Sequence, residues 1–243
     1  MHNPVAHSAV SDALVKFACT PLTDQRVQTA AGDALAQARG RVAAAGDARQ
    51  KIADLLKSQG SAPNDTRVRA WVLGAALATQ SPASTATPVL AAAIAVGEKL
   101  AAADDEIAAA AAIGMEAAAR VLAAVDSEAF RSRWNVASTV GILGAVLAVS
   151  RLLALGETRT RHALGIAATQ AAGLARNAQE SIAAIETGKA AADAVEASLL
   201  AKHGFTSAPA SIDGRRAFAA LMAYRFDALA IMGNLGTHWI SLD

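Results

Sequence analysis

The stretch STVGILGAVLAVSRLLAL, residues 138–155, decides the fold class. Alanine and leucine dominate it, its one charge is Arg151, and it lacks the alternation of apolar and polar residues that marks a half-buried strand. Alanine is the best helix former, and the run stops at Gly156, a residue type common just after a helix. These features predict a helix buried in the core of an all-α protein.

The sequence on either side predicts further helices, because apolar residues recur at spacings of three and four and turn residues separate the runs. Thr23 is expected to cap the second helix. Glu116 and Arg120 are four residues apart, which predicts an ion pair on the exposed side of the helix that starts at Asp104. The expected helices span residues 8–18, 23–38, 48–58, 67–77, 88–101, 104 onward, 138–155, 157–173, 188–203 and 215–230.

Composition limits the possible classes of function. The chain has 243 residues, of which 53% are apolar, and 22 basic residues balance 21 acidic ones. Such a chain has enough apolar surface for a core, and its charge balance gives no reason to expect nucleic acid or a membrane as a partner. The single cysteine excludes an internal disulfide framework, so we expect a cytoplasmic protein. We also expect neither a secretory signal nor a membrane span.

Catalytic motifs are scarce. We find no glycine-rich phosphate loop and no clustered histidines, so neither a cofactor nor a metal is expected. His162 lies within a predicted helix, where a core histidine with one satisfied nitrogen is favoured over a catalytic base. The most polar segment of the apolar half is RSRWNVAST, residues 131–139. As a helix N-terminus next to Arg131 or Arg133 it predicts a carboxylate site, with ordinary capping and solvated arginines as the alternative.

The run RWNVASTVGILGAVLAVSRLLALGETRTRHALGIAATQAAGLAR, residues 133–176, resembles the helical domain of the MmgE/PrpD family. The resemblance continues through LLAKHGFTSAPASIDGRRAFAAL at 199–221 and returns at Leu235–Trp239. This family includes 2-methylcitrate dehydratase, cis-aconitate decarboxylase and iminodisuccinate epimerase. The resemblance implies one helical domain over 1–243, with an N-terminal helix in 1–22. It also implies that 232–243 is a tail at the position of the family's smaller α+β domain, which is expected to be missing.

The sequence departs from the family pattern at the positions that carry its chemistry. The resemblance implies proton abstraction beside a carboxylate, which needs a base and cationic donors. The family's histidine after the aromatic residue is Asn135 here, and its Lys-Arg-x-His stretch falls on Ala183 to Glu186. The family's aspartates and histidines are absent from a shorter segment at 74–88, where Ser84 and Thr85 replace His-Pro. The family reaction is therefore not expected.

Three hypotheses about function follow. The chain is an oligomeric scaffold, expected to be a homodimer, or a small-carboxylate-binding subunit; or it is a re-tooled lyase or isomerase; or it is one chain of a split enzyme whose partner carries the α+β domain. The alanine- and glycine-rich helices and the surface left by the missing domain favour assembly. The candidate pocket comprises Arg133, Trp134, Asn135, Ser138, Thr139, Gln170, Arg176, Asn177, Glu186 and Lys189.

Overall fold

The fold is entirely helical, as the sequence predicts. The computed structural model describes residues 8–62 and 64–242, and over these ranges it has no β-strand, only two isolated bridges. The elements are α1 (Ala9–Cys19), α2 (Gln25–Ala44), α3 (Gly46–Ser58), α4 (Thr66–Gln80), α5 (Ala86–Leu100), α6 (Asp104–Val125), α7 (Glu128–Arg131), α8 (Val136–Thr139), α9 (Gly141–Leu152), α10 (Gly156–Gln170), η1 (Ala175–Asn177), α11 (Ile182–Lys202), α12 (Phe218–Met222), α13 (Ala228–Met232) and η2 (Ile240–Leu242).

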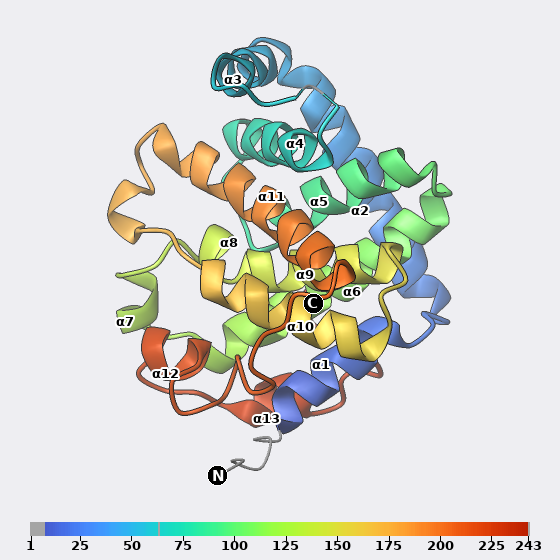
Figure 1. Cartoon of the computed structure of the whole chain (residues 1–243), viewed down its shortest axis with the longest axis vertical. Coiled ribbons are helices and arrows are strands. Elements are labelled where there is room, and N and C mark those ends of the chain that lie inside the picture. Colours follow the sequence, from blue (N-terminus) through green and yellow to red (C-terminus); the bar gives the residue numbers. More distant parts are fainter. Residues whose placement is uncertain (1–7, 63, 243) are drawn as a thin grey trace.

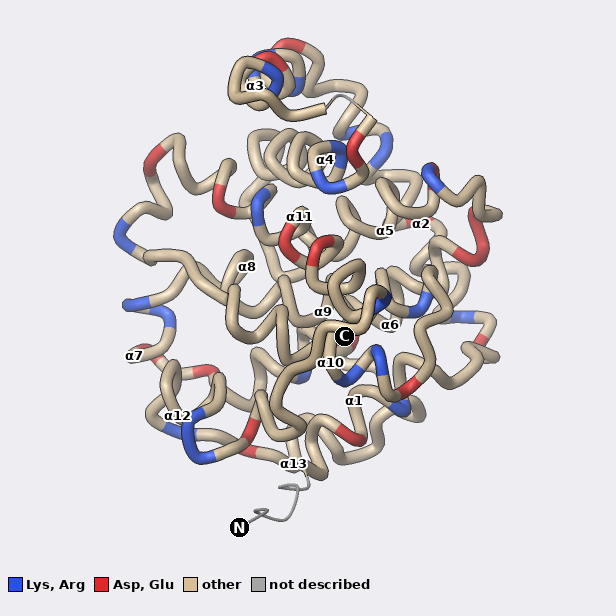
Figure 2. Tube along the Cα trace, viewed as in Figure 1, with Lys and Arg blue, Asp and Glu red and all other residues tan. Residues whose placement is uncertain are grey.

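The predicted core helix lies at the centre of the molecule. α9 contacts α5, α6, α10 and α11, and every residue from Gly141 to Ser150 is buried (Figure 1). α11 packs along α4, with α3 stacked outside α4, while α1, α12 and α13 form the lower edge in this view. The central helices α5 and α9 carry charges only near their C-terminal ends (Figure 2), so apolar packing holds the middle of the fold.

Glycines set the distance between helices at two crossings. A side chain on Gly144 of α9 would overlap the carbonyl oxygen of Gly114 on α6, so the two backbones are in direct contact. A side chain on Gly74 of α4 would likewise come within 2.8 Å of the Cα of Gly188 on α11. Alanines lie against both crossings, Ala118 and Ala148 at the first and Ala91 and Ala191 at the second, so small residues let the helices approach closely.

Several predicted boundaries are wrong. α2 is capped by Asp24 rather than Thr23, because the Asp24 carboxylate accepts the backbone N–H of Arg26 at 2.9 Å. α11 begins at Ile182, six residues before the predicted start. The helix predicted over 215–230 is instead two short ones, because the chain turns at Asp227, whose N–H donates to the carbonyl of Ala124 at 2.9 Å and whose side chain caps α13.

The largest correction concerns Glu116 and Arg120, which form their ion pair in the core and not on the surface. Their side chains are 0% and 2% exposed, and Arg120 Nε donates to Glu116 Oε1 at 2.5 Å. Arg120 also donates to the carbonyls of Gly233 and His238, both at 2.6 Å. Glu116 in turn accepts the N–H of Ser241 at 2.9 Å. The C-terminal segment therefore covers the face of α6 that spacing alone assigned to solvent.

Residues 232–243, expected to be a tail, pack as part of the fold as far as the structure describes them. Trp239 is 7% exposed and its ring lies 5.4 Å from that of Phe17 in α1. Of the predicted N-terminal helix in 1–22, residues 1–7 lie outside the described range, and α1 accounts for most of the rest. The described ends of the chain thus meet on one side of α6.

One described helix, α6, is long and apolar enough to cross a membrane by length and composition. Most of that helix is buried by other parts of the protein. α6 is therefore packed as a helix of the protein core.

We predict that Arg120→Met lowers the free energy of unfolding by about 3–5 kcal/mol, because it leaves the Glu116 carboxylate without its cation in the core. Arg26→Met is the matched control: Arg26 pairs with Asp24, but its side chain is 87% exposed, so a loss below about 1 kcal/mol is expected. Urea unfolding of both variants measures the difference. Equal losses would show that burial of the pair has no energetic consequence.

Candidate functional site

The predicted pocket lies where two chain segments pair. The N–H of Asn135 donates to the carbonyl of Gly173 at 3.1 Å, and the N–H of Ala175 donates to the carbonyl of Arg133 at 3.0 Å. This short antiparallel contact places the residues after α10 beside the start of α8. The structure thereby brings together two groups of the predicted residues, those at 133–139 and those at 170–177.

Two members of the predicted pocket, Arg133 and Trp134, use their side chains for hydrogen bonds within the protein. Arg133 Nη2 and Trp134 Nε1 both donate to the carbonyl of Met222, at 2.7 and 3.0 Å, and the Arg133 guanidinium stacks 4.5 Å from the ring of Tyr224. Arg131, the other arginine considered for a carboxylate, pairs with Asp126 at 2.6 Å. Their hydrogen bonds fix α12 and α7, so the ordinary structural interpretation fits these arginines better than a ligand site.

Asn135 and its neighbours form the N-terminus of α8. The Asn135 Oδ1 accepts the N–H of Ala137 at 3.1 Å, and the Ser138 hydroxyl donates to the carbonyl of Asn135 at 3.2 Å. Gly173 (φ +138°) lies against this turn, and a side chain there would overlap the Ser138 hydroxyl. Gly173 was missed from sequence, because its role depends on a contact with a residue 35 positions earlier in the chain.

Glu186 joins the group from the first turns of α11. Asn177 Nδ2 donates to Glu186 Oε1 at 3.3 Å, which links η1 to α11. Five buried side-chain polar atoms of the described residues have no hydrogen-bond partner, and three of them belong to the predicted pocket: Thr139 Oγ1, Gln170 Oε1 and Glu186 Oε2. Such groups are costly in a folded protein, so their concentration in one set of residues distinguishes it from the rest of the interior.

The remaining predicted residues are on the outside. Lys189 is exposed and holds the carboxylate of Asp193 at 2.5 Å; burial raises the pKa of Asp193 above its usual value, and Lys189 acts in the opposite direction. Arg176 is exposed in η1, with no ion-pair partner among the described residues.

His162 Nδ1 accepts the N–H of Ser207 at 3.2 Å, which agrees with a structural histidine.

The MmgE/PrpD N-terminal domain model matches residues 72–228, well over half of the chain, and this range contains the whole predicted pocket. The chain belongs to the MmgE/PrpD family. No curated protein matches it. The all-α fold agrees with that assignment, since the matched domain is helical.

Three positions are expected from the resemblance to correspond to the family's acid and base residues, and their side chains differ in what they contact here. Asn135 is occupied as a helix cap, and Ala183 has no polar side-chain atom. Glu186 is the ionisable one, with one oxygen bound to Asn177 and the other unpartnered. Among the described residues no three His, Cys, Asp or Glu side chains are grouped to hold a metal ion.

The shortened segment at 74–88 borders a separate small cavity of about 170 Å³. Ser81, Ser84 and Thr87 line one side of it, and Arg41 of α2 lines the other, with Nη1 donating to the Ser81 hydroxyl at 3.4 Å. Thr85, expected with Ser84 at the family's His-Pro position, is the N-cap residue of α5. Hydroxyl groups at this place offer no base of suitable pKa.

We predict that Asn135→Ala lowers the free energy of unfolding by about 1 kcal/mol, because the N-terminus of α8 loses its cap. Asn135→Asp retains the acceptor oxygen and is expected to unfold at nearly the same urea concentration as the unchanged chain. If Asn135→Asp were as damaging as Asn135→Ala, the side chain would have a role other than capping.

Proposed function

We propose that this MmgE/PrpD chain does not perform the dehydration or decarboxylation associated with its family, and acts as an oligomeric scaffold or a small-carboxylate-binding subunit. The observation that carries this proposal is the engagement of Asn135. Its amide caps α8 and cannot accept a proton at neutral pH, so Glu186 is the one ionisable group at the three aligned positions. A single carboxylate supplies neither the second proton-moving group nor the cation that stabilises an enolate.

The binding role draws on the charges left around that site. Arg176 is exposed beside Asn177, and it has no acidic partner within the described ranges. Arginine binds carboxylates through paired hydrogen bonds, so Arg176 is the residue we expect to hold an acidic ligand. The unpartnered oxygens of Thr139 and Gln170 would accept hydrogen bonds from hydroxyl groups on the same ligand.

The oligomeric role draws on exposed apolar side chains near the same segments. Tyr224 stacks on Arg133, and Leu174 pairs with Trp134 through the backbone, so both lie close to the 133–135 segment. The apolar group comprises Leu174, Leu221, Tyr224 and Leu229, which are 54%, 68%, 77% and 71% exposed. Side chains this large and this exposed gain free energy when a second copy covers them.

A second candidate is the re-tooled lyase or isomerase. Glu186 Oε2 is buried and unpartnered, so this carboxylate is the group that would take a proton if the surrounding side chains opened to admit a ligand. A heteromeric lyase whose partner chain carries the α+β domain would use the same apolar group as its contact surface.

We predict that the purified chain does not convert 2-methylcitrate or cis-aconitate above the rate in buffer, because the required acid–base pair is missing. NMR of the reaction mixtures measures substrate and product directly. Turnover that disappears in Glu186→Gln and persists in Glu180→Gln, an exposed control on the preceding loop, would favour the re-tooled enzyme instead.

We predict a homodimer at tens of micromolar (roughly the concentration at which weak dimers with micromolar Kd assemble). Leu221→Asp is expected to shift the population to monomer in sedimentation velocity, because it places a charge in the proposed contact. Leu55→Asp is the control, since Leu55 is an exposed leucine on α3, far from α12. A monomeric unchanged chain, or equal effects of both substitutions, would contradict the proposed contact.

A further inference from the structure

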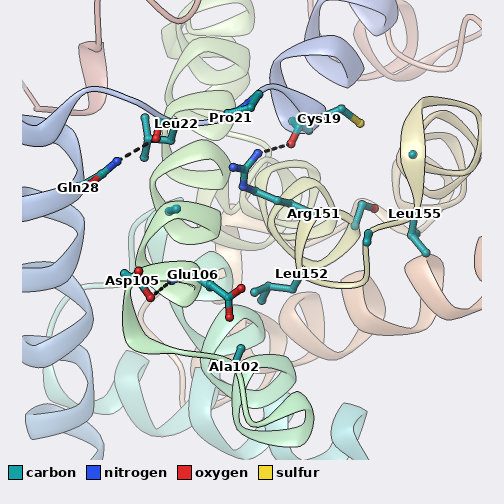
Figure 3. A pocket seen from close by; sticks show the side chains of 15 residues that line it. Cys19, Pro21, Leu22, Gln28, Ala102, Asp105, Glu106, Arg151, Leu152 and Leu155 are labelled. Atoms are coloured by element: carbon teal, nitrogen blue, oxygen red, sulfur yellow. Dashed lines mark hydrogen bonds between the residues drawn. The ribbon is translucent and has the colours of Figure 1, made fainter.

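A cavity of about 690 Å³ lies away from Asn135 and Glu186, between the ends of four helices (Figure 3). The C-terminal ends of α1 and α9 form one side, and the N-terminal parts of α2 and α6 form the other. This volume is within the range of ordinary small-molecule sites. The side chains that matter for binding are Arg151, Asp105 and Glu106, and Leu22 and Leu152 also line the cavity.

Arg151 supplies a positive charge that is only partly used. Its Nη1 donates to the carbonyls of Ala18 and Thr20, at 2.9 and 2.7 Å, and thereby holds the end of α1. Its Nε and Nη2 make no hydrogen bond within residues 8–62 and 64–242, and no carboxylate of these ranges pairs with it. Burial lowers the pKa of the guanidinium, with Cys19 acting in the opposite direction, so the charge lacks a strong counterion.

The opposite side carries two unpaired negative charges. Three acidic residues begin α6, and Asp104 is neutralised by two hydrogen bonds of 2.8 Å from Arg39. Asp105 and Glu106 have no cationic partner in the described part of the chain; each uses one oxygen on backbone N–H groups of the helix start. Figure 3 shows the Glu106 carboxylate turned toward the cavity, with Leu152 near it and Arg151 on another side.

Helix capping uses only some of the polar side-chain atoms of Arg151, Asp105 and Glu106. Capping of α1 employs one nitrogen of Arg151, and capping of α6 employs one oxygen each of Asp105 and Glu106. What remains is a guanidinium edge and two carboxylate oxygens on different sides of one cavity, which apolar side chains also line. Opposite charges held apart in this way match a ligand whose own charges are separated.

We infer that this cavity binds a linear amino carboxylate, with the ligand carboxylate on Arg151, the ammonium group on Glu106 and Asp105, and a short methylene chain along Leu22 and Leu152. This site is separate from the one in the proposed function, and each can fail without the other.

The test uses the full chain and a series of probes of increasing length: glycine, γ-aminobutyrate and ε-aminocaproate. Isothermal titration calorimetry and thermal shift measure binding, with caproate and hexylamine as analogues that keep one charge each. We expect one length to bind best, about tenfold or more tighter than either analogue, because each analogue leaves one charged group of the site unpaired. Absence of binding by every amino carboxylate, or equal binding of caproate, overturns the inference.

Substitutions separate the two ends of the site. Glu106→Gln keeps an oxygen for the cap of α6 but removes the charge, and is expected to weaken the best probe about tenfold without changing the affinity for caproate. Arg151→Gln should weaken both compounds. Asp47→Asn, at the exposed first turn of α3, is the matched control and should change neither. Equal weakening by Asp47→Asn and Glu106→Gln contradicts the site.

Discussion

An arginine in a protein core needs hydrogen-bond acceptors from the protein for its five N–H groups. Arg120 is such a residue, and distant parts of the chain supply its acceptors. Glu116 satisfies one of the N–H groups, and carbonyls of the C-terminal segment satisfy others, among them those of Gly233 and His238. If the residues from α13 to η2 separated from α6, the Arg120 guanidinium would lose these carbonyl acceptors. Because Trp239 also packs on Phe17, the same requirement fixes α1, and both described ends of the chain depend on one helix.

The segment at 133–135 has a similar organising role on the other side of the core. It pairs with 173–175 through its backbone and holds the end of α12 through the side chains of Arg133 and Trp134. The family resemblance resides in this framework of helices and turns. Chemistry depends on the few side chains attached to this framework, and at position 135 that side chain is the amide that caps α8. A fold of this kind does not by itself determine an activity.

The sequence predicted the helical class and the buried α9 correctly, because alanine-rich composition and a long uncharged run are local signals. It also predicted a pocket that includes Asn135, Asn177 and Glu186. The structure joins Asn177 to Glu186 by a hydrogen bond, and the pocket itself stays a prediction. It failed for Glu116 and Arg120, since an i,i+4 pair of opposite charges has the same spacing whether it faces solvent or the core. The cover over that pair comes from residues more than a hundred positions later. For the same reason no pattern near Trp134 indicated its contact with Met222.

The glycine crossings have a consequence for how this protein can change. Alanine and glycine lose no side-chain entropy on folding, although glycine loses the most backbone entropy. A core built from them contains few rotamers that can adjust to a larger neighbour. At Gly144 even one methyl group would meet a carbonyl oxygen. Substitution at this crossing is therefore blocked unless the two helices move apart, so the centre of the fold restricts sequence change more strongly than its surface does.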